Sequence, residues 1–314
     1  MLAHFKKPSS DGFFLSDAVS VPERIAGVTL RLPLLLLWLC ATVAFAQEQY
    51  PFTVESVKEP DGALLWAKND GPAPISLILK LTVAENVTTD VPLPIVAVVA
   101  PRSRERIGRV SVGDRSRAWR YAMSWSYRRG VYTAKHSPAA LYRVPWMDGQ
   151  TFRIGQAPGG VITTHTTPSS RDAVDVTMPM GTPIVAARGG TVIHAVQDYT
   201  LGGKDPALRD KANAVRVLHD DGTIGEYLHF MHQGVAVREG EGVAPGKLLG
   251  YAGSTGFSSA PHLHFAVTRV VLQGETLELV SEPFSFYVGN PPLRFSPKSG
   301  LVVPADYSPG AILP

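Results

Sequence analysis

The chain has 314 residues, of which 45% are hydrophobic, with a formal net charge of +3 and one cysteine. This length favours two domains with terminal segments over a single core, and the small net charge gives no support for a nucleic-acid-binding protein. The 29 glycines and 26 prolines, together with many short β-branched runs, predict an all-β chain rich in turns rather than a helical one.

Residues 1–46 have the pattern of a signal peptide with an extended lead-in. Basic residues precede an apolar run over residues 32–45, and Ala44-Phe45-Ala46 matches an A-x-A cleavage site. From this pattern we expect an exported protein, periplasmic or extracellular. Because the run is short for a membrane span, we expect no stable membrane span after cleavage; a retained anchor is the alternative. The only cysteine, Cys40, lies in this run, so a metal in the mature chain must be held by His and carboxylate side chains.

Residues 47–150 are expected to form a β-sandwich domain of about seven short strands. Two segments alternate apolar and polar residues as half-buried strands do: one buries Ile75, Leu77, Leu79, Leu81 and Val83, and the other buries Tyr121, Met123, Trp125 and Tyr127. Ile78 breaks the first pattern, and we expect it at a sheet edge. This segment has no cluster of His, Cys or paired carboxylates, so we interpret it as a structural or binding module.

A run of arginines in the same domain is opposed locally only by Glu105 and Asp114. Its members are Arg102, Arg104, Arg106, Arg109, Arg115, Arg117, Arg120, Arg128 and Arg129. Such a run can attract an anionic cell-wall polymer or a membrane surface, but it is more often a solvated face.

Residues 151–285 continue the strand-and-turn texture and contain the candidate chemistry. The expected strands are residues 192–196, 214–218, 225–228, 248–251 and 262–268. A charged insertion, residues 197–212, is expected as a loop over a site, with one short helical turn around residues 206–211. Residues 286–314 are expected to be a Pro-rich tail, either packed on the domain or partly disordered.

His262 and His264 are two residues apart in a predicted strand, so both side chains should lie on one face, roughly 7 Å apart. That spacing suits one metal ligand and one neighbour that acts on the metal's water, although such a pair alone is more often structural. Asp175 stands between two valines in a strand-like run, where a divalent cation would offset the desolvation of its carboxylate. His165 and His229 can complete such a site.

The segment from about residue 159 to 268 resembles a known family, the lysostaphin-type or LytM-domain zinc peptidases that cut peptidoglycan cross-links. The resemblance depends on blocks that occur in the family's order: Asp175 followed by residues 178–187, residues 190–192, residues 215–223, Tyr227-Leu228-His229, residues 243–250, and Gly253-Ser254-Thr255-Gly256 leading to Pro261-His262-Leu263-His264-Phe265. It implies a β-rich zinc metalloendopeptidase domain that hydrolyses peptide cross-links of bacterial peptidoglycan. We expect the N-terminal domain to position or gate this domain.

Transferred position by position, the resemblance implies that His165, Asp175 and His264 hold one Zn²⁺ and that His229 and His262 are catalytic. The coordinating atoms of the three ligands should then lie about 3 to 4 Å apart. Many family members place the first ligand His four residues before the Asp, where this chain has Arg171, so His165 requires a longer loop. The alternatives are a catalytically inactive relative that binds peptidoglycan or activates an amidase, and a structural envelope protein.

The remaining histidines in and near this segment are interpreted as structural or surface residues: His136, His194, His219 and His232. Tyr227 precedes His229 by two residues. Its phenol either reaches the same pocket or belongs to the core.

Overall fold

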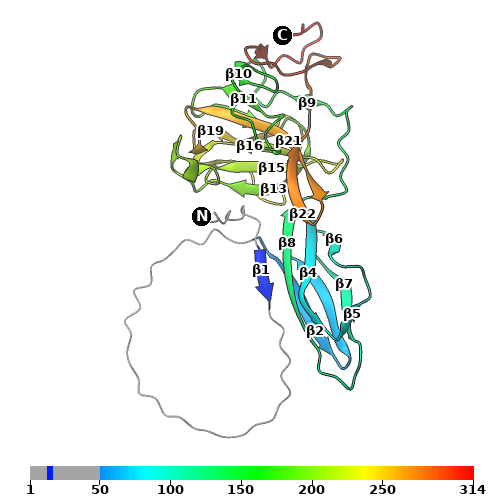
Figure 1. Cartoon of the computed structure of the whole chain (residues 1–314). Helices are drawn as coiled ribbons and strands as arrows, with labels where there is room; N and C mark the ends of the chain where they lie inside the picture. The colour runs from blue at the N-terminus through cyan, green and yellow to red at the C-terminus, as the bar shows by residue number, and fades with distance from the viewer. Residues whose placement is uncertain (1–12, 17–49) are drawn as a thin grey trace, which may run out of the picture.

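The computed structural model in Figure 1 describes residues 13–16 and 50–314. Within them the regular elements are strands and one 3₁₀ helix, which confirms the predicted all-β class. The signal-peptide prediction falls on residues 1–46, which lie outside the described residues apart from Phe13–Ser16. None of the described segments is a helix with the length and hydropathy needed to cross a lipid bilayer.

The N-terminal part consists of two four-stranded antiparallel sheets (Figure 1). In spatial order, the first contains β1 (Phe13–Ser16), β8 (Arg120–Arg129), β4 (Ile75–Glu85) and β6 (Ile95–Val99), and the second contains β2 (Phe52–Glu59), β3 (Gly62–Asn69), β7 (Ser103–Val112) and β5 (Val87–Thr89). Side chains from both sheets share one buried cluster, to which Leu65, Leu77 and Trp125 belong.

The alternation predicted along β8 is confirmed, because its four aromatic and Met side chains are all buried in this cluster. The prediction for Ile78 is wrong. The strand β4 lies between β8 and β6 inside its sheet, and the Ile78 side chain is only 1% exposed. It packs against Val270 and Leu277 of the C-terminal part. Residues 75–79 are therefore buried on both faces of β4, a situation that an alternating pattern cannot indicate.

Nine strands form the main sheet of the C-terminal part. In spatial order they are β18 (Gly242–Val243), β13 (Gly190–Val196), β15 (Ala214–Leu218), β16 (Ile224–Leu228), β21 (His262–Gln273), β11 (Val174–Thr177), β10 (Thr151–Gln156) and β25 (Val302–Pro304), with β22 (Thr276–Ser281) paired to the distal half of β21. Four of the five strands predicted from the sequence lie in this sheet, and β21 continues well past its predicted end.

Three smaller sheets complete the C-terminal part. They contain β12 (Pro183–Val185), β19 (Leu248–Ala252) and β17 (Phe230–Val235); β14 (Gly202–Gly203) and β20 (Gly256–Phe257); and β24 (Leu293–Phe295), β23 (Phe286–Val288) and β9 (Tyr142–Arg143). The insertion at residues 197–212 contains β14 and the 3₁₀ helix η1 (Pro206–Leu208), where the short helical turn was expected. Because β14 pairs with β20, the insertion is tied to the segment that leads to His262.

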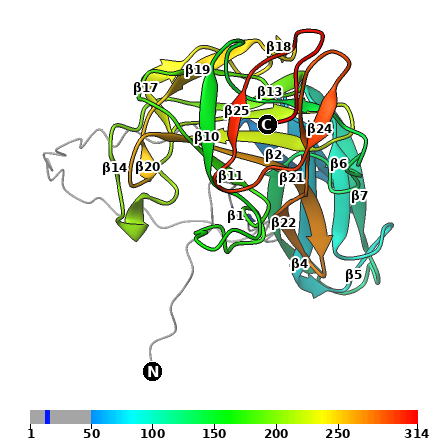
Figure 2. The same ribbon diagram turned by 90° about the horizontal axis from the view of Figure 1, so that it is seen from above.

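The core of the C-terminal part extends beyond residues 151–285 on both sides. Trp146 precedes that range, and Phe286 and Val303 belong to the C-terminal tail, yet all three side chains are fully buried in one cluster. The tail strand β25 lies beside β10 (Figure 2). Of the two expectations for the tail, the packed form is the observed one, while the domain boundaries stay predictions.

The long strand β21 connects the two parts of the molecule (Figure 1). Its first half lies between β16 and β11 in the main sheet, and its second half forms a hairpin with β22 that reaches β4 and β8. Val270 of β21 packs against Ile78 of the N-terminal part. It follows His264 by six residues, which corresponds to roughly 20 Å along a strand. The N-terminal part therefore contacts the end of β21 remote from His262 and His264.

The two parts meet through apolar and polar contacts. Ile193 and Ile224 of the main sheet are buried in the cluster of the N-terminal part. The Arg129 guanidinium donates to the Ile193 carbonyl at 2.9 Å and to Glu239 Oε1 at 2.8 Å. At Gly130, whose φ is +120°, a Cβ would lie 2.9 Å from a Val270 methyl group. Glycine is required where the backbone approaches another segment this closely.

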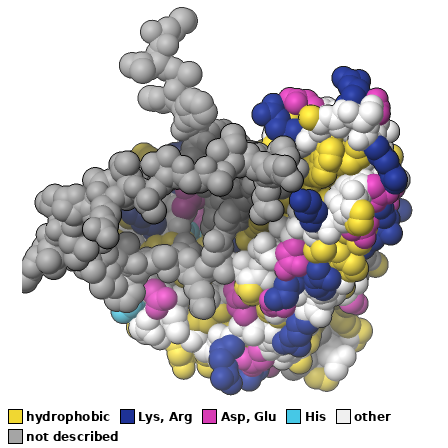
Figure 3. Space-filling view, turned by 90° about the horizontal axis from the view of Figure 1, so that it is seen from below, with side chains coloured by type: hydrophobic (Ala, Val, Ile, Leu, Met, Phe, Trp, Pro, Cys, Tyr) yellow, Lys and Arg dark blue, Asp and Glu magenta, His cyan; other side chains and the backbone are white. Residues whose placement is uncertain are grey.

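The arginine run is largely neutralised by acidic residues from other strands. Ion pairs join Arg104 to Glu55, Arg106 to Asp90, Arg109 to Glu59 and Asp61, Arg115 to Asp61, and Arg120 to Glu85. Figure 3 shows basic and acidic side chains interspersed over one face of the molecule. Exposed pairs of this kind contribute little stability, and their arrangement is that of a solvated face.

Candidate metal centre

Backbone register places the predicted ligands opposite one another. In the antiparallel pairing of β11 and β21, Asp175 faces His264 and Thr177 faces His262. On the other side of β21, Leu228 at the end of β16 faces His264, so His229 follows at the same edge. Directly opposed side chains on one face have Cβ atoms about 5 Å apart, which explains why residues distant in sequence converge here.

The five predicted site residues lie together. The Oδ1 atom of Asp175 is 3.1 Å from His165 Nε2, 2.9 Å from His264 Nδ1 and 3.7 Å from His262 Nε2. One donor atom from each of His165, Asp175 and His264 lies within 4.8 Å of the other two. The ring centroids of His229 and His262 are 4.5 Å apart.

Backbone carbonyls set the tautomers of three of these histidines. Nδ1 of His165 lies 3.2 Å from the Ala173 carbonyl, and Nδ1 of His262 lies 2.8 Å from the Ala260 carbonyl. Nδ1 of His229 lies 2.6 Å from the carbonyl of Thr255. A carbonyl only accepts, so each Nδ1 carries a proton, and Nε2 has a lone pair whenever the ring is neutral. All three rings therefore present a basic nitrogen as a potential ligand or proton acceptor.

Asp175 is a buried carboxylate whose ion-pair partners are histidines. Its side chain is 11% exposed, and the titratable side chains close to it are His165, His262 and His264. Burial alone would raise the pKa of this carboxyl group, but the hydrogen bonds from His165 and His264 outweigh burial and hold the pKa well below its usual range. Asp175 is thus ionised at neutral pH, and a buried anion favours a cation beside it.

His229 is held in a neutral form by its surroundings. Burial lowers the pKa of its imidazole to about 3, and the neighbouring His262 and His264 act in the same direction. Its backbone has a φ of +71°, in the left-handed region that non-glycine residues rarely adopt. Residues in this region concentrate at functional sites, where the surrounding structure maintains them.

A buried polar network supports that conformation. The Thr255 hydroxyl donates to the Phe230 carbonyl at 2.8 Å and accepts from the Asn213 backbone N–H at 3.0 Å. The Asn213 side chain in turn donates to the carbonyls of Tyr199 and Phe230. The network joins the insertion at residues 197–212 to the carbonyl that orients His229, so the insertion lies against the site.

Several other residues are placed away from the cluster. The Tyr227 hydroxyl accepts from the Ala187 N–H at 2.7 Å inside the core, which decides between its two alternatives. His219 is buried with Nδ1 on the Gly189 carbonyl, and His194 lies against Arg129 and Glu239. Sequence reasoning missed Gln156, whose amide contacts Asp175; no local pattern around it indicates this role.

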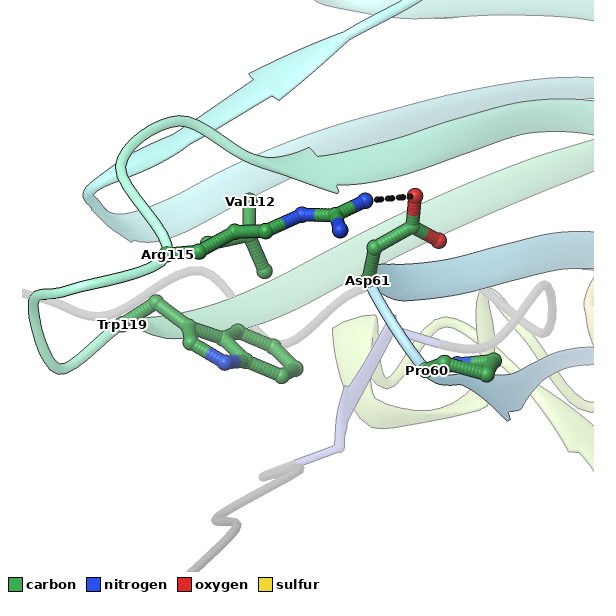
Figure 4. Close-up of a pocket in the computed structure, with 5 residues that line it drawn as sticks. All are labelled: Pro60, Asp61, Val112, Arg115 and Trp119. Carbon is green, nitrogen blue, oxygen red and sulfur yellow. Dashed lines mark hydrogen bonds and ion pairs between the residues drawn. The ribbon is translucent and has the colours of Figure 1, made fainter.

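A small open hollow in the N-terminal part has a different character (Figure 4). It has a volume of about 180 Å³ and is lined by Pro60, Asp61, Val112, Arg115 and Trp119. Its two charged side chains already pair with each other, at 3.1 Å between Arg115 Nη2 and Asp61 Oδ2. The hollow lacks the converging donors of the histidine cluster.

Residues 169–277 match the family model described as Peptidase family M23. This part of the chain is a peptidase family M23 domain. The M23 domain includes Asp175, His229, His262 and His264, while His165 lies four residues before the matched segment.

Curated proteins similar to this chain include lysostaphin and a peptidoglycan DD-endopeptidase. Lysostaphin of Staphylococcus simulans is 36% identical over 93 residues, which cover 29% of this chain and 17% of lysostaphin. Peptidoglycan DD-endopeptidase ShyC of Vibrio cholerae is 34% identical over 107 residues, which cover 33% of this chain and 22% of ShyC. The chain thus spans less than a quarter of the length of these relatives.

Solved structures of M23 proteins also align with the chain. The antimicrobial peptidase lysostaphin from Staphylococcus simulans aligns at 26% identity with a TM-score of 0.32, over 44% of this chain and 50% of that structure. The catalytic domain of the M23 protein EnpA from Enterococcus faecalis aligns at 24% identity with a TM-score of 0.29, over 47% and 92% respectively.

Proposed function

We propose that the chain is an exported zinc metalloendopeptidase that hydrolyses peptide cross-links of bacterial peptidoglycan. The observation that carries this proposal is the buried His165–Asp175–His264 cluster, with His229 and His262 beside it. The names of the relatives that cut peptidoglycan support the substrate class. Export to the periplasm or the cell exterior is proposed from the sequence pattern of residues 1–46.

The donor set fits zinc. Two imidazoles and one carboxylate are ligands that Zn²⁺ accepts in catalytic sites with an open position. Asp175 supplies the negative charge, and His165, whose Nδ1 is occupied by the Ala173 carbonyl, has Nε2 left as its ligand atom beside Asp175 Oδ1. Zinc bound to these three residues would supply a Lewis acid that polarises the scissile carbonyl and acidifies water.

His229 and His262 are proposed to move protons and to stabilise developing charge. In each ring Nδ1 is occupied by a backbone carbonyl, so proton exchange takes place at Nε2. A neutral imidazole there accepts a proton during attack on the amide and returns it to the leaving nitrogen. When protonated, the same Nε2–H donates to the oxyanion of the tetrahedral intermediate.

The N-terminal part is proposed to support the M23 domain rather than to cover its site. It buries Ile193 and Ile224 on the main sheet and contacts the distal end of β21. These contacts lie away from His262 and His264, which are the first and third residues of β21.

The direct test is digestion of purified peptidoglycan by the full chain, followed by mass analysis of the fragments. We expect new fragments from cleaved peptide cross-links, their loss with a chelator, and their return when Zn²⁺ is added. Binding to peptidoglycan without fragments, in the presence of zinc, would overturn the proposal in favour of an inactive binding protein. Stimulation of a separate amidase without intrinsic cleavage would favour the activator alternative.

A further inference from the structure

Gln156 connects the candidate metal ligands from outside the matched M23 segment. It is the last residue of β10, and the pairing of β10 with β11 has a bulge between Ile154 and Gln156 that places Gln156 opposite Asp175. A bulge re-aims the side chain that follows it. Here the Gln156 Nε2 donates to Asp175 Oδ2 at 2.7 Å.

The other end of the same amide holds the segment that carries His165. Gln156 Oε1 accepts from the Thr164 backbone N–H at 2.8 Å and from the Thr164 hydroxyl at 3.3 Å. Thr164 directly precedes His165, in a stretch between β10 and β11 that has no strand of its own. One side chain thus links the carboxylate and the histidine that lie ten residues apart.

The link helps to fix the orientation of the Asp175 carboxylate. With Oδ2 occupied by Gln156, Oδ1 is the atom that contacts His165 and His264. Without the amide, only the contacts of Oδ1 with His165 and His264 would hold the carboxylate, and its terminal torsion, which has a broad energy minimum, would be less restricted. Hydrogen-bond partners of metal ligands of this kind change metal affinity by about 10- to 100-fold when removed.

We propose that Gln156 is a positioning residue that holds Asp175 and the His165 segment in the metal-binding arrangement and thereby sets the zinc affinity of the chain. This inference rests on the proposed function, since it assumes that the cluster binds zinc. It also gives β10, and the tail strand β25 paired to it, a part in the metal centre although both lie outside residues 169–277.

The test compares Gln156→Met and Gln156→Ala with a matched control, Gln150→Ala. Methionine keeps the length of the glutamine side chain and removes the amide, so it isolates the hydrogen bonds from packing. Gln150 lies just before β10, and its buried Oε1 atom has no hydrogen-bond partner among the described residues. Its backbone carbonyl accepts from Trp146 Nε1, a contact that the control substitution keeps.

Zinc affinity is measured on the metal-free full chain by competition with a chromophoric chelator, and thermal unfolding is followed with and without zinc. We expect both Gln156 variants to bind Zn²⁺ about 10- to 100-fold more weakly than the wild type and to show a smaller zinc-induced rise in Tm. The Gln150→Ala chain should bind zinc like the wild type, and metal-free Gln156→Met should unfold close to it.

The outcomes separate this inference from the proposed function. If the wild type and Gln156→Met bind zinc with affinities within twofold of each other, Gln156 does not position the ligands, while the peptidase proposal stands. If the wild type binds no zinc, the metal centre itself is refuted and the role of Gln156 falls with it. An equal loss of affinity in Gln150→Ala would mean that general destabilisation, and not the amide, causes the effect.

Discussion

Replacing Ile78 with alanine should destabilise the N-terminal and C-terminal parts of the chain together. Ile78 belongs to β4 of the N-terminal part, but its side chain packs on Val270 and Leu277 of the β21–β22 hairpin. It points away from the core that the two N-terminal sheets share, since that core contains Leu77 and Leu79 instead. The substitution therefore weakens the contact between the two parts and leaves each separate core filled.

The magnitude follows from burial. Ile78 is 1% exposed, and the change to alanine removes three carbon atoms, equivalent to about 2.4 kcal/mol at about 0.8 kcal/mol per buried methylene. A residual cavity increases the loss, so we expect about 3 kcal/mol, within the range of roughly 2 to 5 kcal/mol for such truncations. This corresponds to an increase of about 100-fold in the population of the unfolded chain.

Hydrogen exchange read by mass spectrometry reports on the two parts separately. The slowest backbone amides of β8 represent the N-terminal part, and those of β15 represent the main sheet. If the parts unfold as one unit, both sets should exchange about 100-fold faster in Ile78→Ala. The control is Val57→Ala on β2, where the side chain is 42% exposed and the expected change is within about 0.5 kcal/mol.

Faster exchange in β8 with unchanged exchange in β15 would refute the reasoning. The two parts would then unfold independently, and the N-terminal part would be a separable module and not a support for the M23 domain. Equal effects of Val57→Ala and Ile78→Ala would also refute the reasoning, because the buried contact of Ile78 would then contribute no more stability than an exposed side chain.

Three further predictions concern single residues. His262→Ala should retain bound zinc and lose at least about 100-fold in peptidoglycan hydrolysis, measured by metal content and fragment release; unchanged turnover would remove His262 from the mechanism. Thr255→Val should lower the free energy of unfolding by about 1 to 3 kcal/mol, because the buried Asn213 N–H loses its partner and the Phe230 carbonyl keeps only the Asn213 side chain; an unaltered urea midpoint would contradict this. Burial lowers the pKa of His219 to about 4 from its usual 6.5, so between those values the unfolded chain binds a proton that the folded chain does not, and stability falls by about 3 kcal/mol as the pH decreases. His219→Asn should reduce this acid sensitivity in unfolding curves measured from pH 7 to 4, and an identical pH dependence would show that His219 is not its source.

Local sequence patterns were sufficient for several strands and for singling out His262, His264 and Asp175, whereas the roles given to His165 and His229 came from the family resemblance. The alternation along residues 121–127 and the position of His262 and His264 in one strand depend only on the period of two in an extended chain. The burial of Asp175 between two valines pointed to a compensating partner, and the structure places three histidines around it. Such features are visible in sequence because each arises from neighbours within a few positions.

Contacts between distant segments were decided by the tertiary structure alone. The burial of Ile78 depends on a hairpin nearly two hundred residues later, and the neutralisation of the arginine run depends on acids from other strands. Gln156 acquires its contact with Asp175 from the register and the bulge between β10 and β11. Periodicity describes which face of a strand is buried, whereas the identity of the neighbour on that face is set by how the sheets and hairpins pack, and this packing has no local signature in the chain.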